Sequence, residues 1–214
     1  MSEVKRHLEQ FLAAEKARTN RKTYTIEGVP FDVDPGVFPP ATDTKLLASH
    51  IRTNANHRIL DLTTGSGVIA VLAGLQGASG YAVDINPQAV QNAQRNLRNA
   101  GVSQIRAVQS DLFSRIPKGL YTQMYVNGPF FEGEISDPLD YACYGTESFY
   151  PRLFSQAGDY LYPEGKIMMV LSEFADTDSI EGMMDAASFD FAVIAKRASD
   201  DRKRIYRLYD ITAR

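Results

Sequence analysis

The sequence predicts an α/β fold: a doubly wound, Rossmann-like, seven-stranded, mostly parallel sheet with one antiparallel strand near the C-terminus, preceded by a short N-terminal helix and hairpin. Two observations lead to this prediction. Strand patterns alternate with helix patterns from residue 57 onward, and the last two strand patterns follow one another without a helix between them. Alternation requires a parallel sheet, and a closing strand pair joined by a short turn makes one strand antiparallel.

Two elements precede the alternating region. Residues 2–17 carry apolar side chains on one helical face, which predicts an amphipathic helix. Residues 23–40 predict a short hairpin followed by an extended segment limited by prolines. We therefore divide the chain into an N-terminal extension over residues 1–40 and a main domain over residues 41–214.

The main domain is predicted to begin with a helix capped by Thr42 or Asp43. A later helix opens at Asn86 and Pro87 and ends at Gly101, because these residue types favour the two ends of a helix. The expected strands cover 57–63, 79–85, 104–111, 122–127, 165–174, 189–197 and 204–213, and the expected helices cover 42–51, 67–76, 86–101 and 179–188.

Composition excludes several classes of protein. The chain has 214 residues, 44% of them hydrophobic, which suits one domain with its own core. Its apolar runs are too short to span a membrane, and its N-terminus lacks the apolar stretch of a secretory signal. A single cysteine, Cys143, fits a reducing compartment, so we expect a cytoplasmic protein. Three histidines that all precede the central motifs argue against a metal site.

Charge is unevenly distributed along the chain. Residues 1–22 carry six bases and three acids, and residues 196–214 carry seven bases and three acids. The central region is therefore acidic. Basic ends can contact nucleic acid, or they can be ordinary solvated termini. An acidic centre disfavours a groove for a phosphate backbone there.

The stretch "LDLTTGSGVIA" (60–70) has the pattern of a strand, a glycine turn and a helix. Gly65 and Gly67 allow the backbone to approach a ligand, and the following helix offers free N–H groups. Asp84 ends the next strand, where a carboxylate can accept both hydroxyls of a ribose. "GSGVIA" also fits the dinucleotide-binding pattern, so this motif alone leaves a nicotinamide cofactor open.

Two further strands end in polar residues. "SDLF" (110–113) places Asp111 and Leu112 after the third strand, where a carboxylate suits the amine of an adenine. "NGPF" (127–130) follows the fourth strand, which lies beside the first at the point where ligands of open α/β sheets bind. We expect these two motifs and the glycine turn to share one site.

Together these segments resemble class I S-adenosylmethionine-dependent methyltransferases, within the branch of HemK-type protein-glutamine methyltransferases and "small-domain" ribosomal RNA methyltransferases. "PGVFPPATDTKLLASHI" resembles the segment that precedes the first strand, and "LDLTTGSG" resembles the D-x-G-T-G-S-G loop. "VDINPQAVQNAQRN" resembles the ribose-binding strand and helix, and "NGPF" resembles the Asn-Pro-Pro-Tyr/Phe motif. The resemblance covers roughly residues 24–175.

The resemblance implies roles for particular residues. The Asn127 side-chain oxygen and the next backbone carbonyl would hold an acceptor nitrogen, and the aromatic Phe130 would stack on a planar acceptor. The implied catalytic residues are Asn127, Pro129 and Phe130. The implied residues for S-adenosylmethionine, and for its product S-adenosylhomocysteine, are Asp61, Thr63, Gly65, Gly67, Asp84, Ile85, Asp111, Leu112 and Asn127. No metal is implied.

The sequence departs from the family pattern at two positions. Thr63 replaces the first glycine of the loop, and its Cβ narrows the turn. Gly128 replaces the first proline of the motif, so the fixed φ of proline is lost. Bacterial glutamine methyltransferases of this family also carry a sizeable helical domain in front. Here one helix and a hairpin precede "PGVFPP", so either a partner supplies recognition or the substrate is small.

The acids that follow the motif bear on the substrate. Glu132, Glu134, Asp137 and Asp140 lie within ten residues of one another; over the entrance to the site they would favour a neutral or cationic acceptor. Tyr141, Tyr144 and Tyr150 would then line the pocket. The other interpretation is a solvated loop with tyrosines facing the core.

We therefore expect an N-methyltransferase acting on a planar amide or amine of a small metabolite or of a protein glutamine. The alternatives are a ribosomal RNA base methyltransferase, a non-catalytic module that binds S-adenosylmethionine, and a nicotinamide-dependent enzyme. We expect no membrane partner, and the oligomeric state stays open.

Overall fold

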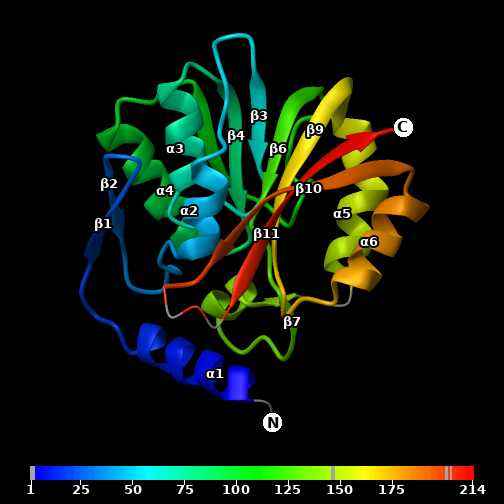
Figure 1. Cartoon of the computed structure of the whole chain (residues 1–214). Helices are drawn as coiled ribbons and strands as arrows, with labels where there is room; N and C mark the ends of the chain where they lie inside the picture. Colours follow the sequence, from blue (N-terminus) through cyan, green and yellow to red (C-terminus); the bar gives the residue numbers. More distant parts are fainter. Residues whose placement is uncertain (1–2, 146–147, 201, 203) are drawn as a thin grey trace.

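The computed structural model describes residues 3–145, 148–200, 202 and 204–214. A seven-stranded sheet in the order β10-β11-β9-β6-β3-β4-β5 forms its centre (Figure 1). The pairs β3-β4, β4-β5, β3-β6 and β6-β9 are parallel, and β11 pairs antiparallel with both of its neighbours. The strands are β3 (Arg58–Asp61), β4 (Ser79–Asp84), β5 (Ile105–Gln109), β6 (Tyr121–Val126), β9 (Leu161–Ser172), β10 (Phe189–Ala198) and β11 (Ile205–Ala213). The predicted fold class is confirmed, including its one antiparallel strand.

Helices cover both faces of this sheet (Figure 1). On one face lie α2 (Thr42–Ala48), α3 (Val68–Leu75) and α4 (Pro87–Asn99), and on the other lie α5 (Phe149–Ala157) and α6 (Thr177–Ala186). Each helical layer encloses its own hydrophobic core against the sheet. The central strands of the sheet are thus buried on both sides, as strands of parallel sheets are, while the edge strand β10 is largely exposed.

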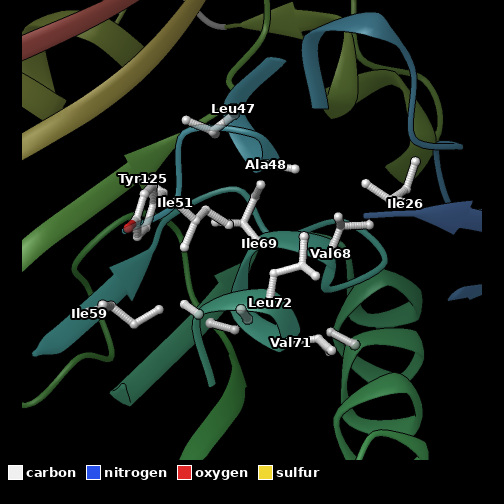
Figure 2. Packing of buried hydrophobic residues seen from close by; sticks show 14 of the residues in the cluster. Ile26, Leu47, Ala48, Ile51, Ile59, Val68, Ile69, Val71, Leu72 and Tyr125 are labelled. Carbon is white, nitrogen blue, oxygen red and sulfur yellow. The ribbon is translucent and has the colours of Figure 1, made fainter. Parts of the chain in front are cut away.

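The glycine turn is held between buried apolar elements. Strand β3 is buried from Ile59 through Asp61, and α3 is apolar on nearly every side, which is the pattern of a helix in a core. Figure 2 shows Ile69 and Leu72 of α3 packed near Ile59 and Tyr125. Because both ends of the turn are anchored in this core, the turn between them has a fixed position.

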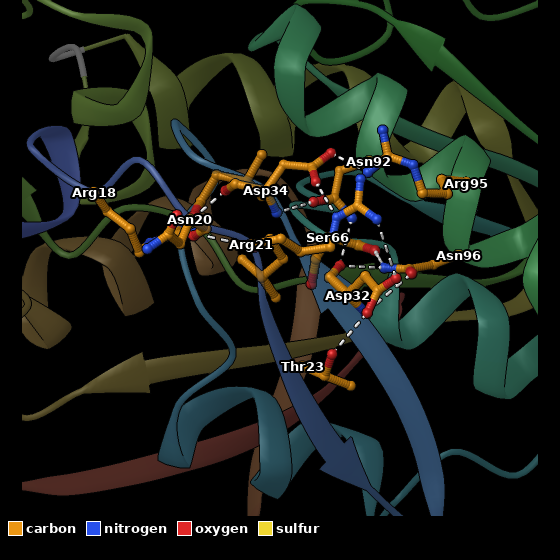
Figure 3. A network of polar contacts seen from close by, with 12 residues as sticks. Arg18, Asn20, Arg21, Thr23, Asp32, Asp34, Ser66, Asn92, Arg95 and Asn96 are labelled. Carbon is orange, nitrogen blue, oxygen red and sulfur yellow. Dashed lines mark hydrogen bonds and ion pairs between the residues drawn. The ribbon is translucent and has the colours of Figure 1, made fainter.

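The N-terminal hairpin of β1 (Lys22–Ile26) and β2 (Val29–Val33) is attached to α4 by side-chain amides (Figure 3). Asn92 Nδ2 donates to the Asp32 carbonyl at 2.7 Å, and its Oδ1 accepts from the Asp34 N–H at 2.7 Å. Asn96 Nδ2 donates to the carbonyls of Asp32 and Ser66, each at 2.8 Å. Since Ser66 belongs to the glycine turn, the hairpin also supports that turn.

Helix α1 (Glu3–Lys16) packs against the segment between β6 and α5. Its Leu12 belongs to a small cluster with Leu139, Cys143 and Tyr144, and Lys16 forms an ion pair with Asp140 at 2.6 Å. These partners lie in or beside η1 (Pro138–Ala142), between the two-residue strands β7 (Phe131–Glu132) and β8 (Tyr144–Gly145). Cys143 is buried, and burial raises its pKa to about 12, so it serves as a packing residue of this cluster.

The main differences from the predicted elements lie between β6 and β9. Helix α5, η1 and η2 (Gly158–Tyr160) were not predicted, and β9 begins four residues before the predicted strand. Helix α5 has Pro151 in its first turn and three aromatic residues, which weakens a helical sequence pattern but is compatible with a first turn. The cap of α2 was also predicted wrongly: Ala41 is the N-cap, and Thr42 and Asp43 lie inside the first turn.

None of the described helices is long and apolar enough to span a membrane.

Candidate active site

A cavity of about 220 Å³ opens at the carboxyl ends of β3, β4, β5 and β6. Strands β3 and β6 are neighbours, and the strands that follow each of them in the chain lie on opposite sides of this pair. Ligands of open α/β sheets usually bind at such a switch point. Most of the predicted site residues line this cavity: Thr63, Gly65, Asp84, Ile85, Asp111, Leu112, Asn127 and Pro129. Segments more than sixty residues apart therefore meet in one site.

The glycine turn presents its backbone to the cavity. Gly65 has φ +52°, and a Cβ built there meets nothing within 4 Å, so the glycine serves the conformation and leaves space beside the turn. The Gly65 N–H donates to Asp84 Oδ2 at 2.9 Å, and the Asn86 N–H donates to Asp84 Oδ1 at 3.0 Å. Burial raises the pKa of Asp84, and these two N–H donors act against that rise. The carboxylate is thus held in one orientation at the edge of the cavity.

Two predicted cofactor residues do not line the cavity. Asp61 is buried at 2% exposure and accepts a 2.7 Å hydrogen bond from the Thr64 hydroxyl. Burial raises its pKa to about 7, the Thr64 bond lowers it, and the charge of Asp84 raises it. Gly67 has φ +87°, and a Cβ there would lie 3.0 Å from Ala93 of α4. Asp61 fixes the turn from behind, and Gly67 allows α3 and α4 to pack closely.

The far end of the cavity is formed after β5. Asp111 lies there, and Arg152 of α5 donates to its Oδ2 at 2.8 Å. Leu112 has φ +47°, an uncommon conformation for a leucine, and its carbonyl accepts from the Ser110 hydroxyl at 2.7 Å. A conformation of this kind costs free energy and persists where surrounding contacts require it. Sequence reasoning did not find Arg152, because it lies in a helix that was not predicted.

At the opposite end, Asn127 is held by both neighbouring segments. Its backbone N–H donates to Thr63 Oγ1 at 3.0 Å, and its Nδ2 donates to Thr44 Oγ1 at 3.3 Å. Its Oδ1 is buried and accepts no hydrogen bond from the described part of the chain. A buried acceptor without a partner costs about 1–3 kcal/mol, so this oxygen is suited to a donor that arrives with a ligand.

Asp43 is a cavity residue that sequence reasoning missed. It lies in the first turn of α2, is 8% exposed, and accepts from the Thr44 N–H at 2.7 Å. Burial raises its pKa, while the Thr44 N–H and the Asn127 amide lower it. Because a carboxylate only accepts, Asp43 favours the Asn127 orientation that turns Nδ2 toward α2 and leaves Oδ1 free. At the sequence level Asp43 was interpreted as a possible helix cap and was therefore not identified as a site residue.

The aromatic residues are arranged differently from the prediction. Phe130 does not line the cavity; it packs against both main cores, and its ring centroid lies 6.1 Å from that of Tyr206. Tyr141 and Tyr144 do line the cavity, together with Phe149 of α5. Tyr150 is not in the lining, and its hydroxyl donates to the Pro129 carbonyl at 2.7 Å.

Of the acidic run, the three described side chains (Glu134, Asp137 and Asp140) do not line the cavity, contrary to one of the two interpretations. Asp137 caps η1, and Asp140 is 3% exposed and accepts from the N–H groups of Ser136 and Asp137 as well as pairing with Lys16. Glu134 is exposed and is not part of the lining, and the side chain of Glu132 lies outside the described residues. Asp137 and Asp140 thus stabilise the segment that carries Tyr141 and Tyr144.

The negative charge of the cavity comes instead from Asp43, Asp84 and Asp111, with Arg152 as the accompanying cation. An anionic cavity suits a cationic ligand and disfavours the pyrophosphate of a nicotinamide dinucleotide. The open turn at Gly65, the oriented Asp84 and the unpaired Asn127 oxygen fit S-adenosylmethionine, a nucleoside with a positively charged sulfur. Among the described residues no cluster of His, Cys, Asp and Glu could hold a metal ion.

Known proteins of similar sequence and structure include methyltransferases. The chain is 31% identical over 116 residues to a putative protein N5-glutamine methyltransferase of Methanocaldococcus jannaschii, covering 54% of this chain and 58% of that protein. It is 29% identical over 164 residues to ribosomal RNA small subunit methyltransferase C of Chromohalobacter salexigens, covering 76% of this chain and 44% of that protein. The chain thus spans about half the length of these curated relatives.

The fold also matches a solved structure over its full length. A methyltransferase from Pyrococcus furiosus superposes with a TM-score of 0.67, at 16% identity and with 100% of both chains covered, which shows a shared fold. The family model described as the methyltransferase small domain matches residues 28–199. The resemblance drawn from the motifs is confirmed: the chain belongs to the methyltransferase small domain family.

Proposed function

We propose that this protein is an S-adenosylmethionine-dependent methyltransferase that acts on the nitrogen of a planar amide or amine, in a small metabolite or a protein glutamine. One observation carries the proposal. Asn127, whose Oδ1 is buried and unpaired within the described part of the chain, lines the same cavity as Asp84, whose carboxylate is oriented by two N–H donors. A cofactor anchor and an acceptor for an incoming N–H therefore occupy two ends of one space.

The cofactor end has a suitable donor and acceptor set. Asp84 would accept the ribose hydroxyls, and Asp111 would accept the adenine amine after its bond with Arg152 opens or is shared. Ile85 and Leu112 offer apolar contacts to the base from the ends of β4 and β5. Thr63 and Gly65 line the path between this end and Asn127.

When bound, S-adenosylmethionine would supply a methyl group on a positively charged sulfur for transfer to the acceptor nitrogen. The electron pair of the C–S bond would leave with the sulfur, and the proton of the nitrogen would go to water. An amide or conjugated amine nitrogen is a weak nucleophile because its lone pair is delocalised. The Asn127 side-chain oxygen would accept a hydrogen bond from one N–H of the acceptor, and this would turn the lone pair of the acceptor nitrogen toward the methyl group. The protein would act mainly through positioning and exclusion of water.

An RNA base is the second candidate acceptor. It is favoured by the ribosomal RNA methyltransferase among the relatives, which aligns with 76% of the chain, and by the basic ends. The three aspartates that line the cavity disfavour a phosphate close to the reacting nitrogen. We therefore place the amide or amine substrate first.

The test combines cofactor binding with methyl transfer. Calorimetry measures S-adenosylhomocysteine binding to wild type, Asn127→Ala and the control Asn99→Ala, an exposed asparagine at the end of α4. Labelled S-adenosylmethionine is then incubated with each protein and with a cell extract separated into small molecules, protein and RNA. We expect label in the small-molecule or protein fraction. Asn127→Ala should slow transfer by about 100- to 1,000-fold and change cofactor affinity less than about threefold.

The other outcomes separate the alternatives. Label that appears in RNA alone would establish the second candidate and overturn the first. Binding of S-adenosylhomocysteine without transfer to any fraction would indicate a non-catalytic binding module. Failure of the wild-type protein to bind S-adenosylhomocysteine would remove the proposal altogether.

A further inference from the structure

An aromatic residue beside the "NGPF" motif comes from α5 rather than from the motif itself. Phe149 lines the cavity, whereas Phe130 does not and is packed against the two main cores. Of these two rings, that of Phe149 is the one available to a planar acceptor in the cavity. This inference rests on the proposed function, since it concerns the acceptor end of the same cavity.

Gly128 makes the position of Phe149 feasible. A Cβ built on Gly128 would lie 2.9 Å from both Cε1 and Cζ of the Phe149 ring, closer than real Cβ contacts allow. Every other residue type, including the proline of the family pattern, carries a Cβ and would displace the ring. The departure at position 128 and the ring from α5 are thus two parts of one arrangement.

A neighbouring contact fixes α5 against the motif. The Tyr150 hydroxyl donates to the Pro129 carbonyl at 2.7 Å, and its ring meets that of Phe149 edge-on with centroids 5.0 Å apart. The other side of Pro129 is closed by Gly145, where a Cβ would lie 2.9 Å from Pro129 Cγ. The first turn of α5 therefore has a defined register relative to Asn127.

We propose that Phe149 forms the aromatic wall of the acceptor site in place of Phe130, and that Gly128 is required because its missing side chain admits this ring. The wall selects planar acceptors, such as amides and heteroaromatic amines, over flexible alkyl amines. Stacking on an aromatic face adds affinity beyond the burial of apolar area.

The first experiment tests the contact without any ligand. Thermal unfolding is measured for Gly128→Ala, Phe149→Ala and the double variant. If the ring occupies the space beside Gly128, Gly128→Ala lowers the midpoint in the wild-type background and has a smaller effect once Phe149 is alanine. Equal effects in both backgrounds would show that the two residues are independent and would overturn the proposal.

The second experiment tests the acceptor role in protein saturated with S-adenosylhomocysteine. N-acetylglutamine amide and adenosine serve as planar probes, and butylamine as a non-planar one, with binding measured by calorimetry. Phe149→Leu, which keeps apolar volume without an aromatic face, should weaken a planar probe by about three- to tenfold and leave butylamine unchanged. Phe130→Leu is the matched comparison and should leave probe affinity unchanged.

The outcomes distinguish this proposal from the function on which it rests. If Phe130→Leu weakens the planar probes and Phe149→Leu does not, the aromatic role belongs to the motif residue and the proposal fails. It also fails if wild type binds no planar probe. If wild type does not bind S-adenosylhomocysteine, the proposed function fails instead, and the unfolding measurements still decide whether Gly128 admits the Phe149 ring.

Discussion

The two ends of the cavity are built in different ways. The cofactor end comes from consecutive elements of the sheet: the glycine turn after β3, Asp84 after β4 and Asp111 after β5. The acceptor end is assembled from four separated segments: α2, the turn after β6, η1 and the start of α5. The first end is fixed by the order of the parallel strands, and the second depends on side-chain contacts between segments.

This difference suggests which end is free to vary. At the cofactor end, Asp84 is oriented by backbone N–H groups, and these are present whatever side chains surround them. At the acceptor end, Asn127 is oriented by the Thr44 and Thr63 hydroxyls, and the neighbouring aromatic wall requires Gly128. A change of substrate can therefore occur through a few side chains while the cofactor end stays intact.

Among substitutions that change cofactor affinity, we expect the largest effect at the cofactor end. Asp84→Ala removes the carboxylate that is placed to accept ribose hydroxyls, and it also releases the Gly65 and Asn86 N–H groups. Hydrogen bonds to a charged group contribute about 1.5–3 kcal/mol each. We expect S-adenosylhomocysteine affinity to fall by at least about 30-fold, measured by calorimetry.

A matched control is Asp159→Ala, an exposed aspartate outside the cavity lining, which should bind as wild type does. Retention of full affinity by Asp84→Ala would contradict the assignment of the two ends, because the cofactor would then not bind at the end formed by β3, β4 and β5.

The same contrast explains what could be predicted from the sequence. Strand ends in a parallel sheet meet at one edge, so the positions of Asp84, Asp111 and Asn127 followed from the alternation of strands and helices alone. The glycine turn was recognisable because Gly65 has a positive φ and open space beside it, and glycine is the residue type that such a position favours. The fold, and the meeting of these residues at one edge of the sheet, could therefore be predicted without a structure.

The acceptor end was not accessible in this way. Asp43 was interpreted as a helix cap, and only the packing of α2 shows that its carboxyl is buried beside Asn127. Phe149 and Arg152 reach the cavity from a helix whose proline and aromatic residues obscured its pattern. Phe130 has the expected position in the motif, but its partly buried ring packs against the two main cores and does not line the cavity. Contacts between distant segments leave no periodic signal in a sequence.

A second prediction concerns pH and the buried Asp61 behind the glycine turn. Its pKa in the folded protein, about 7, lies above its ordinary value of 3.8, so the folded state binds this proton more tightly than the unfolded state. Stability should therefore decrease as the pH rises between these two values, by up to about 1.4 kcal/mol per pH unit, and level off above about pH 7. Asp61→Asn keeps an acceptor for the Thr64 hydroxyl and should flatten this dependence.

Urea unfolding at several values between about pH 5 and pH 8 measures the effect. Asp43→Asn makes the corresponding change at the acceptor end, where burial also raises the pKa of a carboxyl. Glu164→Gln, at an exposed position of β9, is the control. Parallel curves of unfolding free energy against pH for Asp61→Asn and wild type would show that the Asp61 carboxyl does not cause the pH dependence of stability.

The smallest expected effect is at Thr63, the residue that joins the two ends. Its hydroxyl accepts the Asn127 backbone N–H at 3.0 Å, a contact that the glycine of the family pattern would not make. Thr63→Ala should lower the free energy of unfolding by about 1 kcal/mol and slow methyl transfer to the labelled fraction several-fold, with S-adenosylhomocysteine affinity changed less than about twofold. Thr63→Ser keeps the hydroxyl and should behave as wild type does.

If Thr63→Ala instead tightens cofactor binding without slowing transfer, the Thr63 side chain obstructs the cofactor in the loop. The two ends of the cavity would then be independent, because the hydrogen bond between the Thr63 hydroxyl and the Asn127 N–H would have no role in placing the acceptor.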